Sequence, residues 1–411
     1  MAQKFLTGLK GNQSAILFSA SILGIGLGLI SSIVNTRFLN PEEYGNYRYV
    51  YSIISFIASL LLFGYFVSGS RLLALSKTSR IRRKINGALI IILLIATGIT
   101  ISLMIPLYFI HKYWINPDVA SLFLWSIPIV GTPLFLSFIN TTFQGENRIN
   151  ELSLARLLPY VVYVPVGYLV YSHFGSSAVI LMLLQNGIAI IIYILLILRN
   201  HPIFTNLNKV FNQLRKENKT YGRHVYIGSV LAVSFAYVSA ITLGIFEKNN
   251  INVGYYSLAL TMSMPLTMLP GIVGTTHFKE FAFHDKIKAS IIKKTVILTL
   301  ISLIAFIIMI VPLVKWIYTE DYYVVGYYAS FLALGFAFHG FGDMFNRFLG
   351  AHGCGKQIRN SATLTGISQI TGSFILVYFL GIYGAILTRI LSSMIYFIMM
   401  VYYYKKTKIF L

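Results

Sequence analysis

Residues 87–110 read GALIIILLIATGITISLMIPLYFI, a stretch of 24 residues without a charged side chain. A helix needs about 20 apolar residues to cross the hydrocarbon core of a bilayer, so this stretch predicts a transmembrane helix. Eleven further runs of similar length surround it, and none alternates with the two-residue period of a membrane β-strand. The twelve runs lie near 14–34, 49–70, 87–110, 120–141, 153–172, 177–198, 225–246, 255–277, 292–316, 325–346, 362–380 and 383–404.

The overall composition agrees with a membrane protein. Of the 411 residues, 56% are hydrophobic and only 11% are charged, and the mean hydropathy is +0.73. Soluble proteins carry about a quarter charged residues. We therefore expect an all-α integral membrane protein of about twelve transmembrane helices. The first run lacks a cleavage site of small residues, so we expect it to be a retained span. The single cysteine, Cys354, excludes an internal disulfide and a Cys-ligated metal site.

The distribution of Lys and Arg predicts the orientation. If the N-terminus is cytoplasmic, roughly 27 basic residues fall on the cytoplasmic side, an excess typical of cytoplasmic loops. The remaining ones are Arg37, Arg48, Lys112, Lys248, Lys315 and Arg389. The 12 acidic residues divide evenly, so nearly all of the net charge of +21 lies on the cytoplasmic face. The charge therefore marks topology, with both termini cytoplasmic, and we expect no nucleic-acid partner.

Several landmarks recur after about 205–209 residues, which indicates an internal duplication. The matched pairs are Tyr44-Gly45-Asn46-Tyr47 with Val253-Gly254-Tyr255-Tyr256, Pro106 with Pro312, Phe143-Gln144-Gly145 with Phe348-Leu349-Gly350, and Gly175 with Gly381. Six spans per half is an even number, so the two six-helix lobes form a parallel repeat. We expect an N-terminal lobe at 1–198, a cytoplasmic linker at 199–223 and a C-terminal lobe at 224–411. Two such lobes are typical of a carrier that opens alternately to either side.

The segment Arg37-Phe38-Leu39-Asn40-Pro41-Glu42-Glu43-Tyr44-Gly45-Asn46-Tyr47 leads from the first span into the second. It closely resembles the first outer loop of the polysaccharide-biosynthesis flippases, the Wzx-like exporters of O-antigen or capsule repeat units. Their superfamily also holds the multidrug-and-toxin extruders and the lipid II flippases. Span count, repeat length and topology extend the resemblance over the whole chain.

The resemblance implies a function. Such proteins carry an undecaprenyl-diphosphate-linked oligosaccharide from the inner to the outer leaflet for cell-surface polysaccharides such as lipopolysaccharide. It also implies a bacterial inner membrane, contact with the phospholipid bilayer and cooperation with a polysaccharide polymerase. We expect no cofactor and no enzymatic activity, and we expect an ion gradient or the membrane potential to drive transport.

A lipid diphosphate needs cationic partners, and Arg suits it because the guanidinium is planar and bidentate. Arg37 and Arg48 flank the family loop, and by the resemblance spans one, two, seven and eight line the central cleft. We predict that Arg37, Arg48 and Arg71 contact the substrate. The alternative for the first two is a position at the outer interface or pairing with Glu42 and Glu43. For Arg71 it is anchoring at the cytoplasmic face.

Further charged candidates lie in the C-terminal lobe. His277 and Lys279 end the eighth span, where they are candidates for the substrate path, and neighbouring Glu280 is a candidate for ion coupling or local pairing. Asp343 and Arg347 are spaced i,i+4 on one helix face, which predicts an internal ion pair. The alternative is that Asp343 takes up a coupling proton or cation. Arg389 lies inside the twelfth span, deeper than an interface position requires.

Three alternative functions each lack a sequence feature that they need. Residues 350–356 fit the G-x-x-x-x-G-K pattern of a phosphate-binding loop, but Gln357 replaces the hydroxyl residue, so we expect no nucleotide binding. A multidrug-type cation antiporter would need acidic residues inside the N-terminal lobe, and spans one to six have none well inside. A membrane glycosyltransferase or polymerase would need a large outer loop with carboxylates, whereas the outer loops here are short.

Overall fold

The computed structural model describes residues 2–223, 225–226 and 237–406, with the side chains of 2–18 and Lys279 left undescribed. The described residues are almost entirely helical and contain no strand, so the all-α prediction is confirmed. By its contacts the chain divides into two compact units. Unit 1 comprises Met1–Leu39 and Ile53–Val230, and unit 2 comprises Asn40–Ser52 and Leu231–Leu411.

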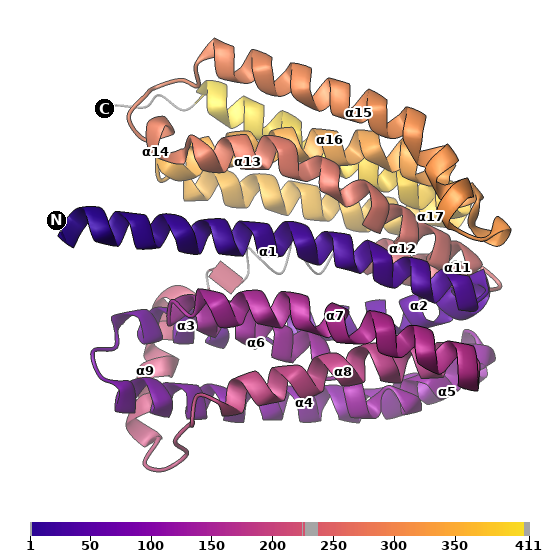
Figure 1. The fold of residues 1–411 in the computed structure, drawn as a ribbon, viewed down its shortest axis with the longest axis horizontal. Coiled ribbons are helices and arrows are strands. Elements are labelled where there is room, and N and C mark those ends of the chain that lie inside the picture. Colours follow the sequence, from indigo (N-terminus) through magenta and orange to yellow (C-terminus); the bar gives the residue numbers. More distant parts are fainter. Residues whose placement is uncertain (1, 224, 227–236, 407–411) are drawn as a thin grey trace. The chain divides into compact units, whose positions relative to one another are not determined.

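The helices follow one another with short connections (Figure 1). Unit 1 contains α1 (Ala2–Phe38), α3 (Tyr65–Leu75), α4 (Ser79–Trp114), α5 (Pro117–Trp125), η1 (Ile127–Ile129), α6 (Thr132–Gly145), α7 (Ile149–Phe174), α8 (Ala178–Leu198), α9 (Asn208–Glu217) and the π-helix η2 (Asn218–Gly222). Unit 2 contains α11 (Val238–Phe246), α12 (Ile251–Ser263), η4 (Met264–Thr267), α13 (Met268–Thr276), α14 (Phe278–Phe281), α15 (Ala289–Ile317), η5 (Glu320–Tyr322), α16 (Val324–Ala351) and α17 (Gly355–Lys406). Helix α2 (Pro41–Leu60) begins in unit 2 and ends in unit 1.

Eight of the described helices are long and apolar enough to cross a membrane, and up to ten if each of two bent pairs forms one span. The bent pairs are α2 with α3, at 58°, and α5 with η1–α6, at 50°. Helix α17 would be about 78 Å long, far more than the roughly 30 Å of a bilayer core. Gly381, with a φ of 54°, breaks it into two segments. The expected run 225–246 lies partly outside the described residues, so the count of twelve stays a prediction.

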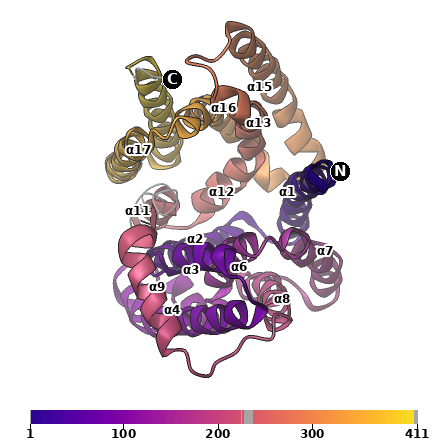
Figure 2. The same ribbon diagram turned by 90° about the vertical axis from the view of Figure 1, so that its left-hand side faces the viewer.

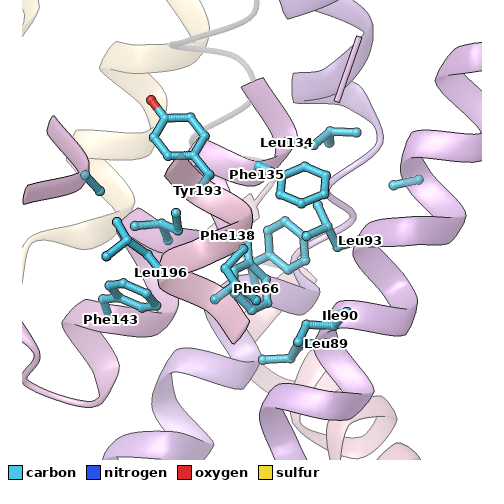
Figure 3. Packing of buried hydrophobic residues seen from close by; sticks show 14 of the residues in the cluster. Phe66, Leu89, Ile90, Leu93, Leu134, Phe135, Phe138, Phe143, Tyr193 and Leu196 are labelled. Atoms are coloured by element: carbon cyan, nitrogen blue, oxygen red, sulfur yellow. The ribbon is translucent and has the colours of Figure 1, made fainter. Parts of the chain in front are cut away.

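Unit 1 is held together by an apolar core. Phe66, Leu93 and Phe138 lie within it, and the rings of Phe66 and Phe138 meet edge to face at 5.5 Å (Figure 3). Elsewhere in the unit, α1 packs along α7, and α9 lies across the ends of α3 and α4 (Figure 2). Gly87 allows the backbone of Ile203 to pack closely against α4, because a Cβ at Gly87 would lie 2.1 Å from the backbone oxygen of Ile203.

Unit 2 is built around α16, which packs against α12, α13, α15 and α17. Its remaining part is the first half of α2, which crosses α12 at glycines. A Cβ on Gly45 would lie 1.9 Å from the backbone oxygen of Asn250, and one on Gly254 would lie 3.1 Å from the nitrogen of Gly45. The Asn250 amide also donates a 2.8 Å hydrogen bond to Asn46. The two loop motifs matched in the repeat are therefore in direct contact.

The other matched landmarks have the same local structure in both halves. Gly175 and Gly381 both adopt positive φ, at 84° and 54°. Pro106 lies inside α4 and Pro312 lies inside α15, each within a long helix. Phe143 and Phe348, near the ends of α6 and α16, are both fully buried. These shared features agree with the duplication predicted from the sequence.

Candidate functional site

Arg48 lies in the first half of α2 among tyrosines. Tyr44, Tyr47 and Tyr51 share its helix face at i−4, i−1 and i+3 and, together with Tyr237, interact with it electrostatically. Its Nε atom is buried and has no hydrogen-bond partner among the described residues. Burying a guanidinium nitrogen without a hydrogen-bond partner lowers the stability of the fold, so this group is suited to donate a hydrogen bond to an anionic ligand.

The two other N-terminal arginines differ from Arg48 and from each other. Arg37 lies exposed in the last turn of α1. Arg71, on α3, forms an ion pair with Glu217 and lies 5.2 Å from the ring centre of Tyr221. The pairing of Arg37 or Arg48 with Glu42 or Glu43 stays a prediction.

The candidates at residues 277–280 lie between α13 and α15. The Nδ1 atom of His277 lies 3.0 Å from the backbone oxygen of Val273, and its ring stacks on Phe281. Glu280 pairs with Lys288 at 2.6 Å, as local pairing predicts. The hydrogen bond from the Lys288 ammonium holds the pKa of the Glu280 carboxyl below its usual range. The side chain of Lys279 lies outside the described residues.

Asp343 and Arg389 meet inside unit 2. The Asp343 carboxylate accepts a 2.9 Å hydrogen bond from the Tyr396 hydroxyl and interacts electrostatically with Arg389. The Arg389 guanidinium lies 4.8 Å from the ring centre of Phe336, and its Nε is buried without a hydrogen-bond partner in the described part of the chain. Arg389 is thus enclosed by other residues of unit 2, and its depth in the membrane stays a prediction.

Asp343 and Arg347 interact electrostatically, but no direct ion pair joins the two side chains among the described residues. Arg347 is exposed and packs its aliphatic stem against Gly274, while Asp343 turns to Tyr396. The physical reason is that i,i+4 spacing only brings two side chains to one helix face. A tyrosine on the adjacent helix segment offers Asp343 a hydrogen bond, and Arg347 keeps its charge accessible to solvent.

Three further residues of this cluster escaped the sequence reasoning. His339, one turn before Asp343, stacks on the Tyr396 ring at 4.6 Å, and its buried Nδ1 has no partner among the described residues. Tyr256 on α12 is fully buried and interacts with Arg389. The i,i+4 spacing of His339 and Asp343 was a visible signal, whereas nothing in the sequence pointed to Tyr256 or Tyr396.

The interior of unit 1 contains a network of neutral polar side chains. Asn35 donates a 3.3 Å hydrogen bond to Gln185 and accepts one from the Tyr163 hydroxyl, which also lies 2.7 Å from that of Tyr171. No cluster of His, Cys, Asp or Glu that could hold a metal ion occurs among the residues that the structure describes. Unit 1 also holds a charged pair in its interior, because Glu146, with 7% of its side chain exposed, pairs with Arg148 and accepts a hydrogen bond from Asn86.

The model of the family described as "Polysaccharide biosynthesis protein" matches residues 11–278. The chain belongs to this family. No curated protein sequence matches it. Solved structures share the fold of this polysaccharide biosynthesis protein at low sequence identity.

A lipid II flippase, MurJ in its inward closed conformation, is 15% identical with a TM-score of 0.75, over 96% of this chain and 88% of that chain. An inward-facing multidrug resistance transporter of the MATE family is also 15% identical, with a TM-score of 0.67 over 95% and 98% of the two chains. The eukaryotic MATE transporter AtDTX14 is 12% identical, with a TM-score of 0.62 over 97% and 96%. The polysaccharide biosynthesis protein is therefore a multi-pass membrane protein that shares its fold with these three solved structures.

Proposed function

We propose that this protein is a flippase that moves an undecaprenyl-diphosphate-linked oligosaccharide from the inner to the outer leaflet by alternating access. The family match over residues 11–278 supports a role in polysaccharide assembly. The proposal includes a bacterial inner membrane, an O-antigen or capsular glycan as the final product, and a polysaccharide polymerase as a partner in the same assembly.

The observation that carries the proposal is the state of Arg48. Its guanidinium is surrounded by tyrosines rather than carboxylates, and its buried Nε lacks a partner within the described residues. A diphosphate supplies the acceptor oxygens that this group lacks, and charge-assisted hydrogen bonds of this kind are strong. The half-buried Tyr51 can at the same time contact a sugar with its ring face and hydroxyl. We assign Arg37, at the start of the same loop, a second contact with the anionic head.

We assign coupling to Asp343 rather than to Glu280. Asp343 lies within a transmembrane helix next to Arg389, and an ionisable side chain at such a place is typically functional. Glu280 is already paired with Lys288. Arg71 is likewise engaged with Glu217, so we expect its contribution to substrate contact to be smaller than that of Arg48.

The test is a transport assay in vesicles with a fluorescent polyprenyl-diphosphate oligosaccharide in the inner leaflet. We expect Arg48→Ala to slow transfer at least tenfold, and Arg48→Lys to recover part of it because the charge remains. Lys112→Ala is the matched control, since Lys112 is exposed and bonds only Tyr108 among the described residues. Equal rates for Arg48→Ala and the wild type would contradict the proposal.

The second candidate function is a multidrug-type cation antiporter, which the fold of the MATE transporters supports. The apolar runs of the N-terminal lobe carry no acidic residue well inside a span, which favours the flippase, because a drug cation needs a carboxylate partner. The assay separates the two functions. Export of organic cations by the purified protein, with no transfer of the lipid-linked sugar, would replace the flippase proposal with the antiporter.

A further inference from the structure

A cavity of about 270 Å³ lies in unit 1, apart from every residue discussed so far as a substrate contact. Its walls come from three elements: the break between α2 and α3, the middle of α4, and α9. Phe63 and Tyr65 contribute the first wall, Ile95 and Ile99 the second, and Phe211 the third. The lining is mainly apolar.

The break in the second span creates this cavity. Phe63 and Gly64 adopt φ angles of 45° and 79°, which turn the chain out of the helix. Asn218 of η2 fixes the turn, because its amide donates a 3.0 Å hydrogen bond to the Phe63 backbone oxygen and its side-chain oxygen accepts one from Ser68 at 3.2 Å. The segment that carries α9 is therefore attached directly to the break, and the cavity lies beside this attachment.

Arg215 lines the rim of the cavity. It is exposed and takes part in none of the ion pairs found among the described residues. Arg71 on α3, in contrast, is paired with Glu217 at the end of α9. Helix α9 buries Val210 and Leu214 and exposes basic residues on its other side. Amphipathic helices with a basic polar face lie at membrane surfaces and attract anionic lipids.

The depth and size of the cavity suit a hydrocarbon chain. Ile95 and Ile99 lie about 12 and 18 Å along α4 from the expected start of its span at residue 87, and both are exposed on a membrane-spanning helix. Sites for whole small molecules enclose about 300–1,000 Å³, so this cavity holds only part of a ligand. An apolar cavity below an unpaired arginine matches a lipid whose phosphate lies at the interface.

We propose that the cavity binds an anionic glycerophospholipid of the surrounding bilayer, with one acyl chain against Ile95 and Ile99 and the phosphate at Arg215. The bilayer's own lipids surround these exposed side chains at high concentration, which favours a phospholipid over the scarce polyprenyl carrier. The bound lipid bridges α4 and α9 and so stabilises the attachment of α9 to the break in span two. The site is independent of the transported substrate.

The experiment uses the full chain in nanodiscs of phosphatidylcholine with a small fraction of phosphatidylglycerol that carries a photoactivatable group on its acyl chain. We expect crosslinks to α4 at Ile95–Ile99 and to Phe211. Arg215→Ala should lower this labelling about fivefold, the effect of one basic residue near a membrane surface. Lys216→Ala removes the same charge from the next position, which does not line the cavity, and should change labelling less than twofold.

Ala96→Phe provides a second variant, because Ala96 lines the cavity and a larger side chain there would fill it. We expect it to abolish the labelling while the protein remains monodisperse. Equal labelling of the Arg215→Ala and Lys216→Ala proteins would overturn the proposal, as would unchanged labelling of Ala96→Phe. Displacement by unlabelled phosphatidylcholine as effective as by phosphatidylglycerol would remove the anionic requirement. Displacement by undecaprenyl phosphate at a lower mole fraction would assign the site to the carrier lipid instead.

Discussion

Asp343 shows how neighbours decide the state of a single buried charge. Its carboxylate lies in α16, accepts a hydrogen bond from the Tyr396 hydroxyl and interacts electrostatically with Arg347 and Arg389. Removing one member of a buried charged pair typically costs about 3–5 kcal/mol, because the other charge is left uncompensated. Replacing both members together costs much less. The two residues should therefore be coupled in any measurement of stability.

We predict that Asp343→Asn and Arg389→Gln each destabilise the folded protein, and that the double variant loses less stability than the sum of the two single losses. The measurement is a double-mutant cycle from unfolding in detergent. Additive effects of the two substitutions would show that the pair is not coupled.

The same Asp343→Asn variant tests ion coupling in the vesicle assay. If Asp343 carries the coupling ion, its transport rate should no longer respond to an imposed pH or sodium gradient, whereas the Glu280→Gln rate should still respond. Gradient-dependent transport by the Asp343→Asn protein at the wild-type rate would exclude this role.

The sequence pointed to some residues of the candidate site and missed others. Arg389 was found because a charge deep in an apolar run is unusual, and that signal is local in sequence. The partner of Asp343 was not found, because Tyr396 lies 53 residues away on another helix segment. The tyrosines around Arg48 share its helix face and were visible in the sequence. The burial of its Nε without a hydrogen-bond partner among the described residues depends on tertiary packing, so it was not visible in the sequence.

At the scale of elements, the crossing of α2 and α12 depends on two glycines. Gly45 and Gly254 approach so closely that a Cβ on either one would meet the backbone of the other helix. Small residues allow this kind of close approach in membranes, where packing rather than the hydrophobic effect drives helix association. The sequence indicated the pair as a repeat landmark, but it gave no sign that the two copies touch.

We predict that Gly45→Ala destabilises the protein by about 3 kcal/mol or more, because its Cβ would lie 1.9 Å from the Asn250 backbone oxygen and the backbone would have to move. Gly98→Ala in α4 is the matched control, since a Cβ there meets nothing within 4 Å. It should stabilise the helix by about 0.5–1 kcal/mol. Thermal unfolding in detergent measures both, and opposite signs are expected. A neutral Gly45→Ala protein would refute the crossing.

For the whole molecule, helical character and membrane insertion followed from apolar run length alone, since no other structure satisfies the backbone within lipid. The length of the apolar runs did not predict how the chain divides into the two units. Hydropathy places a boundary between consecutive spans, whereas residues Asn40–Ser52 pack with unit 2 although the chain on both sides of them belongs to unit 1. Tertiary contacts such as those of Gly45, Asn46 and Arg48 reveal this assignment.

We predict that residues 224–411 expressed alone give little monodisperse protein, because they lack the α2 segment that covers Asn250 and Gly254. Co-expression with residues 1–223 should restore folded protein, measured as the co-purified fraction. Residues 1–223 with Gly45→Ala should fail to restore it, while the same piece with Gly98→Ala should succeed. Full stability of 224–411 alone would contradict the prediction.

The placement of Asn40–Ser52 also has a consequence in time. This segment leaves the ribosome about 180 residues before the first part of unit 2 that it packs against, which at about 5–20 residues per second is roughly 10 to 40 seconds. During that interval Arg48 enters the membrane before Tyr237 exists. The charged first half of α2 therefore has no packing partner in unit 2 during this interval. We expect this stage of biosynthesis to be the most sensitive to the speed of translation.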